Sequence, residues 1–75
     1  MIYRANSRFV RVYINGEPAD LPLGSTVRAL VERLGFAPGQ VAIERNLDIV
    51  PRGSYDHVSL ADGDRVEVVT FVGGG

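Results

Sequence analysis

Three consecutive glycines close the 75-residue sequence, and they offer the clearest chemistry in the chain. Glycine loses more conformational entropy on ordering than any other residue, so a terminal run of it adds nothing to a fold. The run does provide a stem slim enough for a channel that no Cβ could enter, and residues 72–75 would extend about 10–14 Å from the last strand. We therefore expect the α-carboxylate of Gly75 to be the reactive group, with Gly73 and Gly74 giving access to it. The alternative is an incidental, frayed end.

Composition limits the other kinds of chemistry. The chain has no cysteine and one histidine, so thiolate metal sites and cysteine nucleophiles are excluded, and histidine-based metal sites or a Ser/His/Asp arrangement are not expected. His57 is interpreted as a surface or loop-packing residue. We expect no catalytic residue, metal or bound cofactor within the chain. A net charge of −1 without a cationic stripe argues against nucleic acid as a partner.

The sequence carries no targeting or membrane signal. No apolar run approaches the roughly 18 residues of a membrane span, and the N-terminus lacks the apolar stretch of a signal peptide. We therefore expect a cytoplasmic protein that does not bind membranes. All eight basic residues are arginines. Lysine would be a hazard beside an activated acyl group, although GC-rich codon usage is the favoured explanation of its absence.

The N-terminal part of the chain predicts a hairpin. Residues 1–8 have no periodicity and are expected to form a flexible leader. Residues 9–14 alternate in polarity as a half-buried strand does, with Val10, Val12 and Ile14 on one face. Asn15-Gly16 favours a type I′ turn, after which residues 17–21 should return antiparallel.

A single amphipathic helix should follow the hairpin. Ser25 or Thr26 can cap its first turn, and Gly35 can end it in the left-handed conformation. The expected length is about ten residues, which is marginal in water, so the apolar stripe must lie on a sheet. This stripe consists of Val27, Leu30, Val31 and Leu34.

The second half of the chain predicts three more strands. Residues 41–45 form one strand, and Ile49-Val50 forms a short one that Pro51 ends. Residues 52–60 are irregular, with Tyr55, Val58 and Leu60 as expected core anchors. After a turn at residues 62–64, a strand rich in β-branched residues leads into the glycines.

This order of elements, ββαβ(β)β, predicts an α+β domain over residues 9–72, followed by a flexible tail at residues 73–75. A crossover through the helix would place the last strand parallel to the first, in the middle of a mixed sheet of four to five strands. The helix would then pack across one face of that sheet.

The other face of the sheet is the expected docking surface. Alternation along the last strand turns Val66 and Val68 toward the helix and places Glu67, Val69 and Phe71 on the open face. An exposed apolar patch beside the tail is what an enzyme could bind. The expected additional contributors are Tyr13 and Phe9 from the first strand, with Arg11 and Arg52 joining Glu67 in a polar rim. The alternative is that Val69 and Phe71 pack beneath residues 53–60.

Several local motifs resemble those of the ThiS family, the sulfur carriers of thiamine biosynthesis, which have the β-grasp or ubiquitin-like fold. The resemblance covers residues 9–75, whereas residues 1–8 depart from it because family members usually begin at the first strand. Each motif alone is weak, but their order and spacing are specific. The motifs are Asn15-Gly16, residues 41–46, Ile49-Val50-Pro51-Arg52, Asp62-Gly63-Asp64 and the closing Phe71-Val72-Gly73-Gly74-Gly75.

The resemblance implies that the chain is a carrier and a substrate of other enzymes, not an enzyme, and that it is a monomer when free. A ThiF-like or E1-like enzyme would use ATP and Mg²⁺ to adenylate Gly75. A cysteine desulfurase or another persulfide donor would supply the sulfur that replaces AMP and leaves a thiocarboxylate. Thiazole synthase, ThiG, would accept this sulfur.

Two alternatives stay open at this point. The chain could be another diglycine carrier of the same fold, either similar to the small subunit of molybdopterin synthase or a ubiquitin-like protein modifier. It could also be a non-covalent binding module whose tail is idle. The chemical fate of Gly75 separates these readings.

Overall fold

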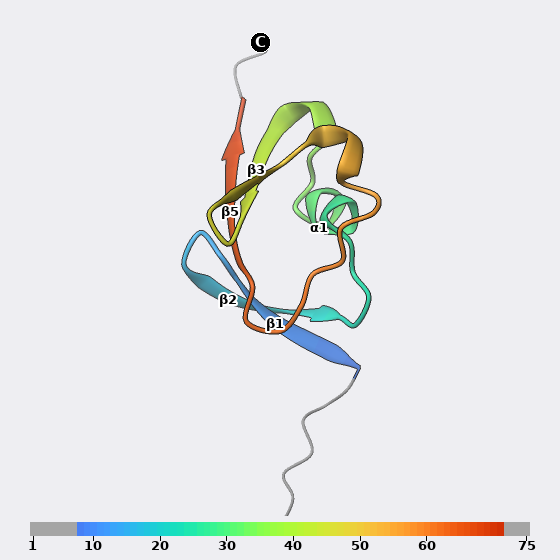
Figure 1. Cartoon of the computed structure of the whole chain (residues 1–75), viewed down its shortest axis with the longest axis vertical. Coiled ribbons are helices and arrows are strands. Elements are labelled where there is room, and N and C mark those ends of the chain that lie inside the picture. Colours follow the sequence, from blue (N-terminus) through green and yellow to red (C-terminus); the bar gives the residue numbers. More distant parts are fainter. Residues whose placement is uncertain (1–7, 72–75) are drawn as a thin grey trace, which may run out of the picture.

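A computed structural model describes residues 8–71 and shows one mixed sheet with a helix packed against it (Figure 1). The five strands lie in the order β2-β1-β5-β3-β4, so the last strand is central as predicted. β1 and β5 are parallel and the other neighbours are antiparallel. This confirms the predicted α+β class. The elements are β1 (Phe9–Ile14), β2 (Glu17–Pro22), α1 (Val27–Arg33), the 3-10 turn η1 (Pro38–Gln40), β3 (Val41–Arg45), β4 (Asp48–Val50), the 3-10 turn η2 (Arg52–Ser54) and β5 (Arg65–Thr70).

The predicted leader and tail fall almost wholly outside the described residues. Only Arg8 of the leader is described, and its carbonyl accepts a hydrogen bond of 2.7 Å from the Leu23 N–H. β1 begins near the bottom of Figure 1 and β5 ends near its top. The described chain therefore enters and leaves the sheet at opposite ends.

The first hairpin forms as its turn residues predict. Asn15 has a φ of 50° and Gly16 a φ of 87°, as a type I′ turn requires. The Asn15 side chain also reaches the central strand. Its Oδ1 accepts from the Val68 N–H at 2.7 Å, and its Nδ2 donates to the Val68 carbonyl at 3.2 Å. One turn residue thereby lengthens the ladder between β1 and β5.

Helix α1 is shorter than predicted. Thr26 is its N-cap and accepts a 3.1 Å hydrogen bond from the Ala29 N–H, but the helix spans seven residues instead of about ten. Gly35, with a φ of 91°, reverses the chain, and the Phe36 N–H bonds back to Val31 in a Schellman motif. Phe36 therefore packs against the core, whereas Leu34, wrongly predicted as part of the apolar stripe, is 39% exposed. No helix within residues 8–71 is long and apolar enough to cross a membrane.

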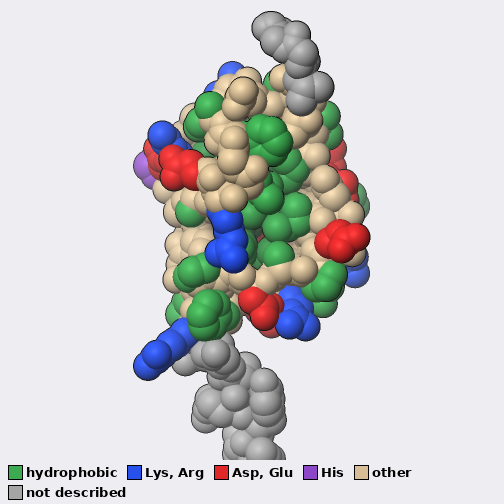
Figure 2. Space-filling model, turned by 180° about the vertical axis from the view of Figure 1, so that it is seen from behind, with side chains coloured by type: hydrophobic (Ala, Val, Ile, Leu, Met, Phe, Trp, Pro, Cys, Tyr) green, Lys and Arg blue, Asp and Glu red, His purple; other side chains and the backbone are tan. Residues whose placement is uncertain are grey.

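The core lies between α1 and the sheet. Val12 and Val66 from the two parallel strands are fully buried there with Val27 and Val31 of the helix. The irregular segment closes one side of this core, because Tyr55 and Leu60 are buried and Val58 packs against the core, as predicted. Viewed from behind, hydrophobic side chains still reach the surface in the middle of the molecule, with charged groups around them (Figure 2).

Candidate functional site

β5 is the strand that precedes the tail, and it is paired with β1 on one side and with β3 on the other. β3 pairs with it from Arg45 opposite Val66 to Val41 opposite Thr70. One residue beyond the strand, the Phe71 N–H still donates to the Gln40 carbonyl at 2.7 Å. The predicted reactive residues Gly73, Gly74 and Gly75 lie outside the described residues. The structure therefore defines the base from which they leave: a central strand hydrogen-bonded up to Phe71.

The start of β5 is fastened by a second asparagine. Asn46 occupies the turn after β3 with a φ of 51°. Its backbone N–H donates to the Arg65 carbonyl at 2.8 Å, and its Oδ1 accepts from the Arg65 N–H at 2.9 Å. Asn15 and Asn46 thus fix β5 from opposite sides, and each combines a left-handed turn with side-chain pairing to the strand.

A buried carboxylate secures the turn that leads into β5. Asp64 accepts hydrogen bonds from the Ala61 N–H at 2.8 Å, the Asn46 amide at 3.0 Å and Arg45 Nε at 2.8 Å. Burial alone would raise the pKa of Asp64, but these donors favour the charged form and lower the pKa below its ordinary value. The predicted turn at residues 62–64 is therefore also an electrostatic anchor.

The face of β3, β4 and β5 turned away from α1, here called the open face, carries three of the side chains predicted for docking: Glu67, Val69 and Phe71. Val69 is 58% exposed and Phe71 is 50% exposed, so neither packs beneath residues 53–60. Ile49 of β4, which the sequence analysis did not select, is 74% exposed on the same face. Ala42 lies directly opposite Val69. The apolar part of the open face therefore continues from the edge strand to the base of the tail.

The structure does not bring Tyr13 and Phe9 to this apolar area. Tyr13 pairs with Arg65 at the start of β5, and the Arg65 guanidinium lies 5.6 Å from the centre of its ring. Phe71 follows Arg65 by six positions along the strand, a distance of about 20 Å. Phe9 lies farther away, because β1 runs toward Tyr13 from the opposite end. Both residues had been expected to join the patch beside the tail.

The predicted polar rim is likewise dispersed. Arg11 is paired with Asp20 at 2.8 Å. Asp20 belongs to β2, which is the edge strand at the opposite end of the strand order from β3 and β4. Arg52 begins η2, beyond the edge strand β4. Of the predicted charged residues, only Glu67 lies among the apolar side chains of the open face, where it is directly opposite Glu44.

Comparison with known proteins identifies the family. The model of the ThiS family matches residues 12–75. The chain belongs to the ThiS family. This ThiS-family chain is 47% identical over 66 residues to a thiazole synthase of Magnetococcus marinus, covering 88% of the chain and 20% of that protein. It is also 49% identical over 35 residues to the sulfur carrier protein ThiS of Bacillus subtilis, covering 47% of the chain and 53% of that protein.

Solved structures agree with this assignment. The crystal structure of the thiamine biosynthesis protein ThiS from Geobacter metallireducens is 30% identical, with a TM-score of 0.73, and the match covers 88% of this chain and all of that one. A protein designed on a ubiquitin template is 16% identical with a TM-score of 0.53, which supports the fold alone. The ubiquitin-like β-grasp fold implied by the motifs is confirmed. The chain spans about a fifth of the length of the thiazole synthases that it matches.

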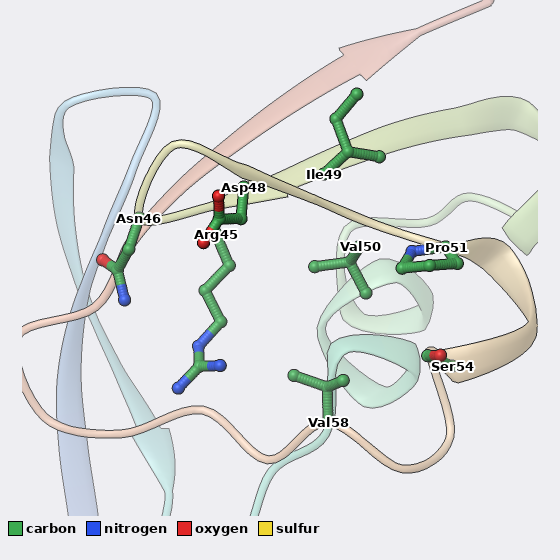
Figure 3. Close-up of a pocket in the computed structure, with 8 residues that line it drawn as sticks. All are labelled: Arg45, Asn46, Asp48, Ile49, Val50, Pro51, Ser54 and Val58. Atoms are coloured by element: carbon green, nitrogen blue, oxygen red, sulfur yellow. The ribbon is translucent and has the colours of Figure 1, made fainter.

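This ThiS-family chain has a hollow of about 270 Å³ between β4 and η2 (Figure 3). Val50, Pro51 and Val58 form its apolar part, and the Arg45 side chain extends along its other end. That guanidinium is already paired with Asp64. Within residues 8–71, no group of three or more histidine, cysteine or acidic side chains could hold a metal ion. We therefore interpret Arg45, which lines this hollow, and its partner Asp64 as a structural anchor.

Proposed function

We propose that this chain is a sulfur carrier of thiamine biosynthesis and that its C-terminal glycine carries the sulfur. The Gly75 carboxylate attacks the α-phosphate of ATP on a ThiF-like enzyme, and pyrophosphate leaves. The terminal sulfur of a persulfide then displaces AMP from the acyl-adenylate. A thiol cleaves the resulting acyl disulfide and leaves a thiocarboxylate on Gly75.

The observation that carries this proposal is the anchoring of β5, the strand that precedes the tail. A terminal carboxyl group is ionised at neutral pH and needs no activating neighbour within its own chain. It does need a rigid support that an enzyme can hold while the glycines enter the enzyme's active site. β5 supplies this support, because it is central in the sheet and remains hydrogen-bonded up to Phe71. ATP and Mg²⁺ would belong to the activating enzyme.

The comparisons support thiazole synthase as the acceptor of the sulfur. Two relatives that bear this name include a stretch similar to 88% of this chain. A carrier domain within the same polypeptide as its acceptor has a high effective concentration there. We infer that this chain meets a thiazole synthase in the cytoplasm and that it is a monomer when free. A ThiF-like enzyme and a persulfide donor such as a cysteine desulfurase complete the expected partners.

Mass spectrometry of the whole protein tests the proposal. The chain is incubated with a cognate activating enzyme, ATP, Mg²⁺ and a persulfide donor. The expected product has one oxygen replaced by sulfur, and without the donor the adenylate should accumulate instead. A matched chain that lacks Gly75 should give neither product.

Other outcomes identify the alternatives. Isopeptide adducts to lysines of other proteins, without any thiocarboxylate, would indicate a ubiquitin-like modifier. Transfer of sulfur to a molybdopterin precursor, with no transfer to thiazole synthase, would indicate a carrier of that other pathway. Partner binding and activity that both survive removal of Gly75 would indicate a non-covalent module.

A further inference from the structure

Two carboxylates face each other on the open face. Glu44 of β3 and Glu67 of β5 are directly opposite in the antiparallel register. The Cβ atoms of such a pair are about 4.5–5.5 Å apart, and like charges in this position destabilise a sheet. None of the ion pairs within residues 8–71 involves either glutamate. Arg65 lies two positions before Glu67 on β5 and therefore on the same face. Its guanidinium, however, lies over the Tyr13 ring.

The surroundings of the pair are apolar. Ile49 of β4 lies directly opposite Glu44 on its other side, so one row across three strands reads Ile49, Glu44, Glu67. Val69 and Ala42 form the next row toward the tail. Together these residues line an open hollow of about 300 Å³. We call it the open-face hollow, and it is lined by Ala42, Ile43, Glu44, Ile49, Glu67 and Val69.

An arginine side chain fits this chemistry. Its methylene stem can lie along Ile49 and Val69, as long cationic side chains do on apolar surfaces. Its planar guanidinium carries donors on more than one edge, so it can bond both carboxylates at once. The positive charge would turn the repulsion between Glu44 and Glu67 into attraction. A lysine could neutralise the charge but offers no planar fork.

We propose that the open-face hollow binds an arginine of the thiazole synthase that receives the tail. The proposal rests on the proposed function, because it concerns the surface beside the same tail. Val69 forms the end of the hollow nearest the tail, and the exposed apolar surface continues from it to Phe71, where the described chain ends. A partner that holds this arginine therefore sits close enough to receive the glycine stem. Glu44 and Glu67 are positioning and specificity residues; the chemistry stays on Gly75.

Neutral, isosteric substitutions test this proposal. Binding of the full-length chain to its cognate thiazole synthase is measured by titration calorimetry for the wild type, E44Q, E67Q and the double variant. Each single variant should bind about tenfold more weakly, since a hydrogen bond to a charged group contributes on that order. Added salt should weaken wild-type binding more than binding of the double variant. E17Q is the matched control, because Glu17 is exposed on β2 and its register with Ile14 turns it toward the helix side.

A stability measurement separates a binding role from structural damage. Removing one of two facing charges should raise the unfolding midpoint of E44Q and E67Q slightly while affinity falls. Equal affinity of all variants for thiazole synthase would overturn the proposal, and so would a loss confined to the activating enzyme. The proposed function fails separately: in that case the wild type itself takes up no sulfur at Gly75. Normal sulfur uptake with unchanged binding of the double variant rejects only the role of the hollow.

Discussion

Replacing Asn15 by glycine isolates the side-chain link that holds β5 to the first hairpin. Glycine adopts the observed φ of 50° without strain, so the turn itself should survive. What is removed are the two hydrogen bonds to Val68, at 2.7 and 3.2 Å. A hydrogen bond of this kind contributes about 0.5–1.5 kcal/mol net, and the added backbone freedom of glycine subtracts a little more. We expect N15G to lower the free energy of unfolding by about 1–3 kcal/mol.

Urea denaturation measures this change, and amide hydrogen exchange locates it. The Val68 amide should lose protection in N15G, whereas the Val41 to Arg45 strand should change only with global stability. N15D is the matched control, because aspartate tolerates the left-handed turn and keeps an acceptor for the Val68 N–H. It should fall between the wild type and N15G. Unchanged stability of N15G together with unchanged Val68 exchange would refute the clamp.

Three further perturbations probe the site. D64N should lower stability by about 2–3 kcal/mol at neutral pH, because Arg45 loses its charged partner. The folded-state pKa of Asp64 is lowered, so its contribution is present above the ordinary aspartate pKa and is lost on acidification below about pH 4; urea denaturation across pH should show this loss in the wild type and not in D64N. L47G should stabilise the chain by about 1 kcal/mol in thermal unfolding, because Leu47 has a φ of 75° and is 89% exposed; a lower unfolding midpoint would contradict this. F71A should change stability by less than about 0.5 kcal/mol but slow sulfur uptake at Gly75, and an unchanged rate would remove Phe71 from the docking surface.

Local signals in the sequence predicted most of the fold. Asn15-Gly16 and Gly35 require left-handed backbone, and the structure has it at both places. The β-branched density of residues 65–70 predicted a central strand correctly. The helix end at Gly35 was predicted correctly. The placement of Leu34 in the core was wrong, because Leu34 and Phe36 are both apolar and periodicity alone does not show which of them reaches the core.

The site depended on features that local patterns do not contain. Alternation predicted correctly that Val69 and Phe71 face away from the helix. It could not give the offset between β1 and β5, which places Tyr13 beside Arg65 instead of beside Phe71. The facing of Glu44 and Glu67 depends in the same way on the register between β3 and β5. The asparagine links to β5 join residues far apart in the chain and become visible only in the folded sheet.

The central claim is that the reactive atom of this protein is the terminal carbonyl carbon, presented by a body that performs no chemistry. Tandem mass spectrometry of the C-terminal peptide after reaction tests it most directly, because fragment ions locate the added sulfur to one residue. We predict that all of the sulfur is on Gly75. Sulfur bound elsewhere, or a C-terminal peptide unchanged by an activating enzyme that is active on its own carrier, would contradict the account.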